Sequence, residues 1–513
     1  MDRPDVIAFT RTVGGKIAGG ARAVLQRANL FAELGYPVTV VVTGTTSDVE
    51  VARLRARGDL HPDVRLKHFV TDGPSWQDRV AASARMPVEP PRLDERTPGV
   101  RREVIDSGKS KIIRTLVDDQ LRSEEVRDTD GLTTRSFRRY DEHGQCSQLW
   151  RYQRGRVVMV DELIDGVADV RHFYLDGRLR WLTAQVAGTS GTGRAVHHDG
   201  TETDYAGAIA GWLDREFADR ARLVVFADGE NVWQRTLRSM RHPGVRGVSI
   251  LHNSHLDEPY DAAAPTKPDW QPYFSDTRNV DVMVCLTARQ REHLLQRYPG
   301  LPLRLVHHAV PARPGTSGSA ASRRIVFLGR LAEQKRLDHL VEVFDRVAAA
   351  VDDVVLDVYG HGTQEDEFRR AIDERGLSAR VNFAGFTDDA LGAFAAGRVS
   401  VMTSRYEGLP LTLTESMSVG TPFVAYDINY GPAEVIRDGV DGFLVPPGDV
   451  DQFAERVVRL LTDDSLAMRM SAAAREVSTR FSRQRYRTEW LEVLQTAAAD
   501  RSTPTSPVLE VVR

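Results

Sequence analysis

Two glutamates frame a short apolar window of the sequence. Residues 407–415 read EGLPLTLTE, which places Glu407 and Glu415 on either side of seven mostly apolar or hydroxylic residues. Because Pro410 suits the first turn of a helix, we expect Glu407 in the loop after a strand and Glu415 about one turn into that helix. A carboxylate in apolar surroundings needs hydrogen-bonding partners, and sugar hydroxyls are good ones. The window therefore indicates either an acid/base pair or two ligand-binding carboxylates.

Two cations follow a strand-like segment earlier in the chain. The stretch GRLAEQKRLDHL places Arg330 at the end of that segment and Lys335 five residues later, just before a helical pattern. A strand, a cationic loop and a helix N-terminus together are typical of an anion site, and a diphosphate suits it. The alternative is that both side chains are solvated loop charges, which is the commoner role of an isolated Arg–Lys pair.

Glycines and histidines follow other strand-like segments. In VYGHG, Gly360 and Gly362 would leave the backbone bare for the close approach of a ligand. In ILHNSH, His252 and His255 follow a strand of the N-terminal half. Histidines at strand ends are more often structural or solvated than catalytic, and only a position opposite the cationic loop favours a role in binding. We favour His252 because it lies closer to its strand.

These residues need two α/β halves to position them. Strand DVIAFT, a glycine-containing loop, a helix at about 21–34 and strand PVTVVVTG form a β-loop-α-β unit, the opening of a Rossmann-like half. The same half continues with strand patterns at 222–228, 246–255 and 280–287. After the Gly/Ser-rich linker at 312–322, six strands alternate with helices and predict a doubly wound parallel sheet. These six strands are expected at 323–330, 354–362, 381–386, 399–404, 422–427 and 442–446.

The segment between the two parts of the first half has a different pattern. From about 80 to 201, a proline-containing polar linker precedes short aromatic and β-branched runs separated by hairpin signals such as DEHG and HHDG. We expect an antiparallel β-rich insert whose aromatics pack its own core or, alternatively, present a binding face; these are Trp150, Tyr152, Phe173, Tyr174 and Trp181. The predicted domains are 1–80 and 204–312 (Rossmann-like), 81–203 (insert), 313–480 (second Rossmann-like domain) and 481–513 (C-terminal helix and tail).

Composition excludes several classes of protein. A net charge of −4 over 513 residues argues against a general nucleic-acid binder, which usually has a strong basic excess. Cys146 and Cys285 lie far apart, so neither a disulfide framework nor a zinc site is expected. The N-terminus has no signal-peptide pattern, and no run approaches eighteen apolar residues. We therefore expect a cytoplasmic protein, and peripheral contact with the inner face of the membrane stays open.

A joint pattern of motifs resembles one family. The stretches GGKIAGGAR, GRLAEQK, YGHG, the Glu-x7-Glu window and GVDGFLVPPGDVDQFAERV together are similar to the GT-B glycosyltransferases of family four. The resemblance implies an α/β fold with two Rossmann-like domains facing a cleft, and a retaining enzyme that uses a nucleotide-sugar donor. The insert and INYGPAEVIRDG look like the poly(glycerol-phosphate) α-glycosyltransferases, which decorate wall teichoic acid and have relatives that glycosylate serine-rich adhesins.

The resemblance also implies residue roles. Arg330 and Lys335 would hold the donor diphosphate, so that no metal and no cofactor is required. Glu407 would contact the transferred sugar near its 3-hydroxyl, and His252 would lie near that sugar, with His255 as the second candidate. The remaining donor-binding positions implied are Gly14, Gly15, Gly19 and Gly20 in the N-terminal loop, Gly360, Gly362, Phe386 beside the base, Gly408, Leu409 and Pro410 beside sugar and phosphate, and Glu415 at the ribose.

The implied reaction moves glucose or N-acetylglucosamine from a UDP-sugar to a hydroxyl acceptor. The acceptor expected is a poly(glycerol-phosphate) or teichoic-acid-like polymer or another cell-envelope glycan; alternatives are serine or threonine of a protein and a lipid-linked glycan. No residue of the window is an evident nucleophile, so we expect a front-face path in which the departing phosphate oxygen helps to deprotonate the acceptor. The insert would support acceptor contact or a homo-oligomer.

Two other classes of protein compete with this interpretation. A dinucleotide-dependent oxidoreductase would need a clean GxGxxG with an acidic residue about twenty positions on, and the first glycine loop does not supply it. A non-catalytic GT-B carbohydrate-binding scaffold would not need intact Arg330, Lys335, Glu407 and Glu415. UDP release from candidate UDP-sugars discriminates an enzyme from such a scaffold.

Overall fold

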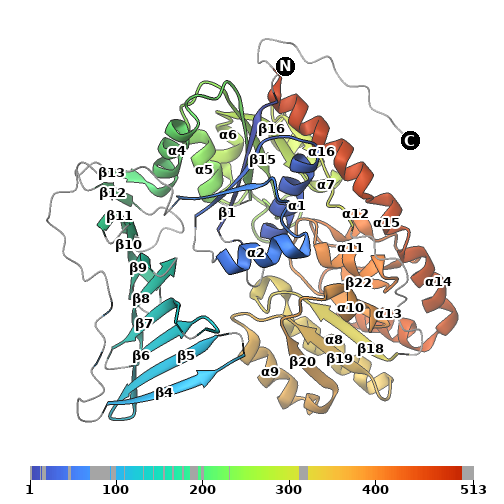
Figure 1. Cartoon of the computed structure of the whole chain (residues 1–513). Coiled ribbons are helices and arrows are strands. Elements are labelled where there is room, and N and C mark those ends of the chain that lie inside the picture. The colour runs from blue at the N-terminus through green and yellow to red at the C-terminus, as the bar shows by residue number, and fades with distance from the viewer. Residues whose placement is uncertain are drawn as a thin grey trace. The chain divides into compact units, whose positions relative to one another are not determined.

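The computed structural model divides into two units, Met1–Gly247 and Val248–Arg513 (Figure 1). It describes residues 3–11, 13, 19–43, 48–69, 90, 93, 100–108, 110–130, 132–141, 144–153, 156–164, 167–175, 178–184, 194–197, 202–229, 231–310 and 322–499. Within these ranges, no helix is long and apolar enough to cross a bilayer. The five-part domain division given above stays a prediction.

The first unit contains a parallel sheet with the strand order β14-β1-β2-β3. The central strand β1 pairs in parallel with β2 and with β14. All residues of β1, β2 and β14 are buried, as expected of parallel strands covered on both faces. The elements are β1 (Asp5–Thr10), α1 (Gly19–Glu33), β2 (Val38–Val42), α2 (Asp48–Arg57), β3 (Arg65–His68), α4 (Tyr205–Glu216), β14 (Leu223–Asp228) and α5 (Asn231–Ser239).

The same unit contains a ten-stranded antiparallel sheet in which each strand pairs with the next along the chain. Its strands are β4 (Val100–Asp106), β5 (Lys111–Val117), β6 (Gln120–Arg127), β7 (Thr134–Tyr140), β8 (Cys146–Gln153), β9 (Arg156–Ile164), β10 (Val167–Leu175), β11 (Arg178–Ala184), β12 (Arg194–His197) and β13 (Glu202–Asp204). Asp118 and Asp119 have positive φ at the β5–β6 turn, as a tight hairpin requires. The predicted antiparallel β-rich insert is therefore confirmed over the described residues.

Aromatic residues of this antiparallel sheet form a small buried cluster. Trp150 and Tyr152 are buried together with Phe137, and the rings of Phe137 and Trp150 meet edge to face at 5.7 Å. These two predicted aromatics thus belong to a core. The side chains of the other three lie outside what the structure describes; they are Phe173, Tyr174 and Trp181.

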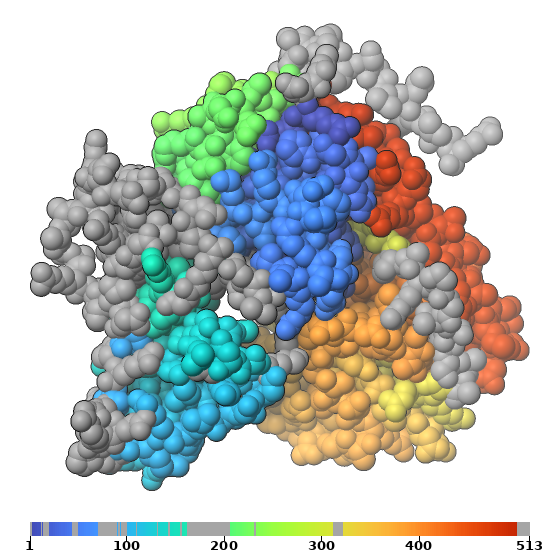
Figure 2. All heavy atoms as spheres, in the orientation of Figure 1, coloured from blue at the N-terminus to red at the C-terminus, as the bar shows by residue number. Residues whose placement is uncertain are grey.

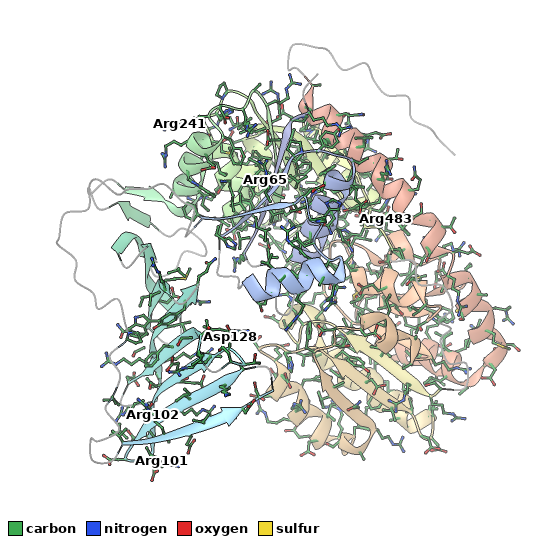
Figure 3. The ribbon with its side chains drawn as sticks, in the orientation of Figure 1. Arg65, Arg101, Arg102, Asp128, Arg241 and Arg483 are labelled. Carbon is green, nitrogen blue, oxygen red and sulfur yellow. The ribbon has the colours of Figure 1, made fainter. Side chains whose placement is uncertain are left out.

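Ion pairs cover much of the described part of the antiparallel sheet. Glu124 on β6 accepts from Arg114 on β5 at 3.1 Å and from Arg138 on β7 at 2.6 Å. Arg101 on β4 pairs with Glu103 and Asp119; Figure 3 labels it at the edge of the sheet. In the space-filling view the cyan strands β4 to β7 lie at the surface (Figure 2). Ion pairs around the buried Glu124 therefore connect β5, β6 and β7.

The second unit contains β15, β16 and β17 as neighbours in one parallel arrangement. They are β15 (Val245–Ile250), within which the boundary between the units falls, β16 (Val280–Cys285) and β17 (Leu303–Leu305), accompanied by α6 (Gln271–Ser275) and α7 (Ala288–Arg297). Thr287 caps α7 by accepting a hydrogen bond from the Gln290 amide. A core of Leu251, Met283, Cys285 and Leu294 lies between these elements.

The second unit also contains a six-stranded parallel sheet with the order β20-β19-β18-β21-β22-β23. Its strands are β18 (Arg324–Leu328), β19 (Val355–Tyr359), β20 (Val381–Gly385), β21 (Val399–Met402), β22 (Phe423–Tyr426) and β23 (Gly442–Val445). All six predicted strands are confirmed. The strand order reverses between β18 and β21, and ligands of open α/β sheets bind outside the carboxyl ends of the strands at such a reversal.

Helices connect and flank these strands. They are η1 (Glu333–Lys335), α8 (Leu337–Ala350), α9 (Glu365–Glu374), η2 (Ser378–Arg380), α10 (Ala390–Ala395), α11 (Leu411–Ser418), α12 (Pro432–Val435), α13 (Val450–Thr462), α14 (Asp464–Ala474), α15 (Val477–Arg480) and α16 (Arg483–Ala498). The largest described core of the unit joins α8 and α13 to the sheet through Phe344, Val347, Phe453 and Val457. The predicted C-terminal helix is α16, with Ser482 as its N-cap.

Candidate functional site

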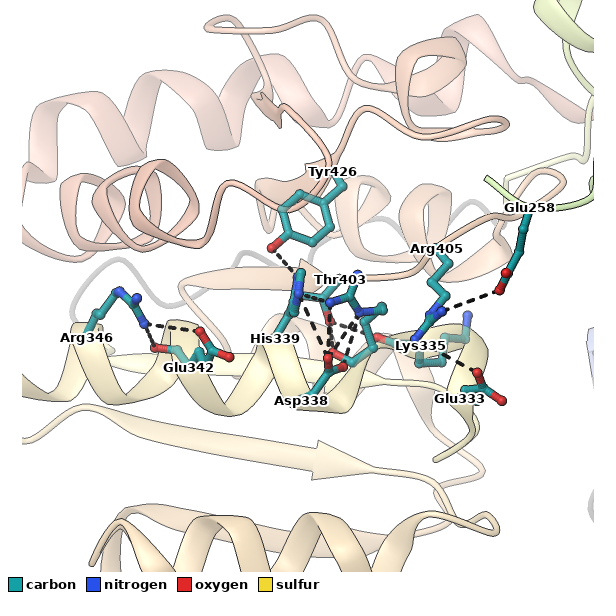
Figure 4. Close-up of polar contacts among 11 residues, drawn as sticks. Glu258, Glu333, Lys335, Asp338, His339, Glu342, Arg346, Thr403, Arg405 and Tyr426 are labelled. Atoms are coloured by element: carbon teal, nitrogen blue, oxygen red, sulfur yellow. Dashed lines mark hydrogen bonds and ion pairs between the residues drawn. The ribbon is translucent and has the colours of Figure 1, made fainter. Parts of the chain in front are cut away.

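Two loops flank the reversal of the six-stranded sheet. The first leaves β18 at Gly329 and Arg330, forms the short turn η1, and enters α8 through Arg336, whose φ of 49° is left-handed. The second leaves β21 at Thr403. The Thr403 hydroxyl donates to the carbonyl oxygens of Lys335 at 2.8 Å and Arg336 at 3.0 Å (Figure 4). The two loops are therefore joined through the backbone beside Lys335.

The same loops are joined by an ion pair. The Lys335 Nζ lies 2.6 Å from Glu407 Oε1, and the two side chains are only 13% and 10% exposed. Two of the predicted site residues thus meet although they lie 72 positions apart in the chain. Removing one partner of so buried a pair leaves a charge uncompensated. An anionic ligand that reaches Lys335 would share its ammonium with Glu407.

Arg330 lies at the exposed rim of this arrangement. Its Nη2 donates to Gln334 Oε1 at 3.3 Å. The Gln334 side chain donates in turn to the Tyr406 carbonyl at 2.8 Å, and the Gln334 carbonyl accepts from the Arg405 amide at 2.8 Å. Gln334 thus joins the predicted cation to the second loop. Sequence reasoning missed it, although it stands next to Lys335 in the GRLAEQK motif.

Gly360 and Gly362 are explained by the packing of the backbone. A Cβ on Gly360, which has a φ of 135°, would lie 1.9 Å from the Gly329 carbonyl oxygen, and one on Gly362 would lie 2.1 Å from that of Leu331. Both glycines therefore permit the β19 loop to lie against the loop that carries Arg330. The close approach of a ligand to these glycines stays a prediction.

His252 lies next to the Glu407 loop. A Cβ on Gly408 would lie 2.2 Å from the His252 carbonyl oxygen, so glycine at this position lets the loop contact the segment that follows β15. The His252 ring is partly exposed and stacks on His308 with centroids 5.9 Å apart. The preferred histidine and the predicted backbone position Gly408 are thus adjacent.

His255 has a different environment. It is fully buried, stacked on Tyr430 at 5.9 Å and edge-on to Phe274 at 5.7 Å, and neither ring nitrogen has a hydrogen-bond partner. Burial, assisted by the positive charge of Arg297, lowers the pKa of His255 to about 3. The ring is therefore neutral at ordinary pH and belongs to the core, which favours His252 as the residue that contacts a ligand.

The rest of the opening window forms the start of α11. Gly408 and Leu409 are buried, Pro410 is the N-cap residue, and the helix begins at Leu411. Pro410 thus stands one position before the first turn in which it was expected. Glu415 lies one turn into the helix, as predicted, and is 7% exposed. The two carboxylates therefore occupy different elements, the loop and the helix.

The remaining predicted positions are spread over both units. Phe386 directly follows β20 and is 38% exposed, while Gly385 before it accepts a hydrogen bond from the Gly360 amide at 2.8 Å. Gly14 and Gly15 lie outside the described residues. Gly19 and Gly20 open α1 of the first unit, and a Cβ on Gly20 would meet nothing within 4 Å. Packing in the described residues gives no reason for Gly20.

Tyr430 supports the Glu407 loop and was not singled out from the sequence. Its amide donates to the Glu407 carbonyl at 3.1 Å, and its hydroxyl lies 2.9 Å from His293 Nδ1. The side chain is 1% exposed, and burial raises the pKa of its hydroxyl far above the usual range. The one feature of the sequence that could have indicated a role for Tyr430 is its place in the INYGP stretch, in which Gly431 packs against Pro410.

The described residues contain no group of three His, Cys, Asp or Glu side chains placed to hold a metal ion. Cys146 and Cys285 are both unbridged. The predicted independence of metal ions stays a prediction, because a donor substrate supplies ligands of its own.

Comparison with known proteins finds a family match in the C-terminal part of the chain. Residues 318–477 match the family model described as "Glycosyl transferases group 1". This range contains both loops at the strand reversal, with Arg330, Lys335, Glu407 and Glu415.

Curated relatives resemble about half of the chain. A poly(ribitol-phosphate) alpha-N-acetylglucosaminyltransferase of Staphylococcus aureus is 23% identical over 55% of this chain and 57% of its own length. A poly(glycerol-phosphate) alpha-glucosyltransferase of Bacillus subtilis is 26% identical over 47% of this chain and 36% of its own. An exopolysaccharide phosphotransferase of Streptomyces coelicolor is 32% identical over 44% of this chain and 24% of its own. The chain thus aligns with less than two thirds of each of these proteins.

The overall fold resembles that of solved GT-B enzymes. A variant of S. aureus TarM, crystallised with Fondaparinux, alpha-GlcNAc-glycerol and UDP, superposes with a TM-score of 0.72 at 16% identity over 96% of this chain and 99% of TarM. At this identity the likeness establishes the fold. The α/β fold of GT-B type with an antiparallel β-rich insert, predicted from the sequence, is confirmed.

Proposed function

Because residues 318–477 match the family model of the group 1 glycosyl transferases, we propose that the chain is a retaining, metal-independent glycosyltransferase. It transfers a hexose, glucose or N-acetylglucosamine, from a UDP-sugar to a hydroxyl acceptor. The observation that carries the proposal is the Lys335–Glu407 ion pair at the strand reversal. It combines a cation suited to phosphate with a carboxylate suited to sugar hydroxyls, at the edge where α/β sheets bind ligands.

Lys335 and Arg330 are assigned to the donor diphosphate. Departure of the sugar leaves negative charge on the UDP oxygen, and fixed cations at that oxygen stabilise the transition state. Lys335 is held from both sides, by Glu407 at its ammonium and by Thr403 at its carbonyl. Arg330 at the rim supplies a planar fork that suits phosphate oxygens.

Glu407 and Glu415 receive separate binding roles. Glu407 accepts hydrogen bonds from the transferred sugar near its 3-hydroxyl, while Glu415, on α11, binds the ribose hydroxyls. His252 lies beside Gly408 and contacts the donor sugar. Donor binding is further assigned to Gly360, Gly362, Phe386, Leu409 and Pro410 of the second unit and, in the first unit, to Gly15, Gly19 and Gly20.

The proposed chemistry proceeds on one face of the sugar. The bond between the anomeric carbon and the UDP oxygen breaks while the acceptor oxygen bonds to the same face. The departing phosphate oxygen takes the proton of the acceptor hydroxyl, which balances the reaction without a protein nucleophile. A glycosidase-type carboxylate pair would instead need two unpaired groups about 5 to 10 Å apart across the sugar, whereas Glu407 is paired with Lys335.

The proposed acceptor is a cell-envelope polymer with a polyol-phosphate backbone. Similarity to a poly(ribitol-phosphate) and a poly(glycerol-phosphate) glycosyltransferase supports this class. We assign to the insert either acceptor contact or a homo-oligomer contact. In the described part of the insert, several arginines pair with acidic neighbours, which favours the second role, and the edge strand β4 exposes Val104 to 67% and Ile105 to 39%. The proposed location is cytoplasmic, at the inner face of the membrane.

A donor-by-acceptor screen tests the proposal. The full chain is mixed with UDP-glucose or UDP-N-acetylglucosamine, with and without glycerol-phosphate or ribitol-phosphate oligomers, and UDP release and product anomer are measured in the presence of EDTA. An α-linked product on a polyol phosphate supports the proposal. Transfer to a serine-rich peptide or a lipid-linked glycan instead would replace the polyol phosphate as the proposed acceptor. If no donor releases UDP, the proposal that the chain is an enzyme is overturned in favour of a carbohydrate-binding scaffold.

A further inference from the structure

A short closed loop of the second unit lies beside the proposed site. Residues 257–265 are enclosed by a bridge between Leu256 and Thr266 and by a hydrogen bond from the Asp257 amide to the Pro265 carbonyl at 2.8 Å. Within this loop Tyr260 has a φ of 67°, a conformation that tyrosine rarely adopts. Its carbonyl accepts from Asn429 Nδ2 at 3.1 Å, which helps to hold that conformation. Such strain persists only where the surroundings enforce it.

The loop contacts the residue that immediately precedes Glu407. The rings of Tyr260 and Tyr406 lie with centroids 4.5 Å apart. The Lys267 Nζ, at the end of the loop, stands 3.9 Å from the Tyr406 centroid and 5.6 Å from that of Tyr260. The same Nζ donates to the Ser254 carbonyl at 3.1 Å. Lys267 thus has a cation–π contact with Tyr406 in a partly desolvated position.

The opposite side of the Tyr406 segment is held by the η1 turn. The Tyr406 carbonyl accepts from Gln334, and Arg405 lies 3.9 Å from Glu333 of η1 and, toward the closed loop, 3.8 Å from Glu258 (Figure 4). Tyr406 is therefore clamped between the turn that carries Lys335 and the 257–265 loop with Lys267 just beyond it.

We propose that Lys267 is a positioning residue of the transfer reaction: its ammonium, stacked on Tyr406, fixes the place of Glu407 relative to Lys335. The inference rests on the proposed function of Glu407. A carboxylate that binds a sugar hydroxyl loses its effect when it is displaced by as little as about 1 Å. The clamp prevents that displacement, because Tyr406 and Glu407 are consecutive and Tyr406 has little room between Gln334 and Lys267.

Lys267 does not serve as a cation for substrate phosphate. Its ammonium is already committed to a carbonyl and an aromatic ring, and burial lowers its pKa. A lysine bound to a phosphate of the acceptor, away from the leaving group, would act on the KM of the acceptor; Lys335 differs, because it is assigned to the leaving group and therefore acts on kcat. A positioning lysine acts on kcat instead, because substrate binding is maintained by other groups.

The first test replaces Lys267 in the full chain. Lys267→Met keeps the length of the side chain and removes its charge; we expect kcat to fall by about tenfold or more with the KM of donor and acceptor little changed. Lys267→Arg restores most of kcat, because a guanidinium also stacks on tyrosine. The matched control is Lys67→Met, at a lysine of the first unit that pairs with Glu216, which leaves kcat unchanged.

The second test measures coupling with the ring. Tyr406→Leu lowers kcat to a similar extent, Tyr406→Phe retains more activity than Tyr406→Leu, and the double variant with Lys267→Met loses little beyond either single variant. Tyr406→Leu also carries the test if Lys267→Met folds poorly, which thermal unfolding reveals.

Three results overturn the inference: wild-type kcat in Lys267→Met, additive losses in the double variant, or a loss confined to the acceptor KM. None of these touches the proposed function, which fails only if the wild-type chain itself releases no UDP from any donor.

Discussion

Two regions that contain ion pairs use the same kinds of charged side chain differently. In the antiparallel sheet, Arg114 and Arg138 flank Glu124 on neighbouring strands, and both arginines are about 40% exposed. At the strand reversal, Lys335 and Glu407 pair at 13% and 10% exposure, on loops rather than strands. The Glu124 side chain is itself only 9% exposed, but both of its arginines reach water, which screens these pairs and makes their loss cheap, whereas at the strand reversal both charges are largely dry. Burial of the cation and its position at a loop, rather than residue type, separate a ligand site from a stabilised surface.

Lys335→Ala should produce the largest effect. It removes the cation assigned to the leaving group and leaves Glu407 buried without its partner, so we expect kcat to fall by about 10²–10³-fold and unfolding to become easier by about 3 kcal/mol. UDP release and chemical denaturation measure the two effects. Lys67→Ala, in a more exposed pair with Glu216, is the control. Near-normal turnover in Lys335→Ala would remove the proposed diphosphate role.

Replacing Arg330 should lower catalysis while leaving stability almost unchanged. Because its side chain is exposed and donates to Gln334 at 3.3 Å, Arg330→Ala should leave the free energy of unfolding within about 0.5 kcal/mol of the wild-type value. Transfer should nevertheless fall about 100-fold. Arg330→Lys should also lose activity, because the planar fork is lost. Arg346→Lys, at an exposed pair with Asp451, is the matched control; equal kcat in both lysine variants would contradict the assignment.

Two predicted donor-site glycines should respond in opposite directions. Gly360→Ala forces a Cβ against the Gly329 carbonyl at a φ of 135°, and we expect a loss of about 3 kcal/mol or more in the free energy of unfolding. Gly20→Ala, in an exposed helical position with open space around it, should gain about 0.5–1 kcal/mol. Thermal unfolding compares them. A Gly20→Ala protein that is stabilised but inactive would support the assignment of Gly20 to the donor loop.

His255 should make stability depend on pH. Its pKa is lowered to about 3 by burial, whereas in the unfolded chain it is about 6.5. Above pH 6.5 the His255 ring is neutral in both the folded and the unfolded chain, so it adds no pH dependence to the free energy of unfolding. Between pH 6.5 and 3 only the unfolded chain binds the proton, so stability falls with falling pH, by about 1.4 kcal/mol per pH unit at most. Denaturation at several pH values should show a shallower slope in His255→Phe than in His252→Phe; equal slopes would contradict the burial argument.

The helices and strands could be predicted from the sequence, but not which segments lie side by side in the fold. The six strands of the second unit were predicted because each hydrophobic run is bounded by turn residues, and α11 because Pro410 precedes a helical pattern. That Lys335 meets Glu407 depends on β21 lying next to β18, which the periodicity of either segment does not encode. Tyr430, Gln334 and Lys267 were missed for the same reason, because their partners are distant in the chain.

The glycines show a second limit. Gly360 and Gly362 were interpreted as openings for a ligand, whereas their nearest neighbours are the carbonyls of Gly329 and Leu331. A missing Cβ indicates that something approaches closely, but not whether it is a ligand or another part of the backbone. In this fold the two explanations are linked, because the backbone that approaches is the one that carries Arg330.

The smallest effect is expected in the antiparallel sheet. Glu124→Gln keeps the shape of the side chain and removes the charge shared by Arg114 and Arg138. Because both arginines reach water, we expect a cost of about 1 kcal/mol or less, measured by chemical denaturation, and no change in kcat. High salt should weaken the wild-type pair and reduce even this difference. A loss as large as that of Lys335→Ala would mean that the exposure of the paired cations does not separate the two regions.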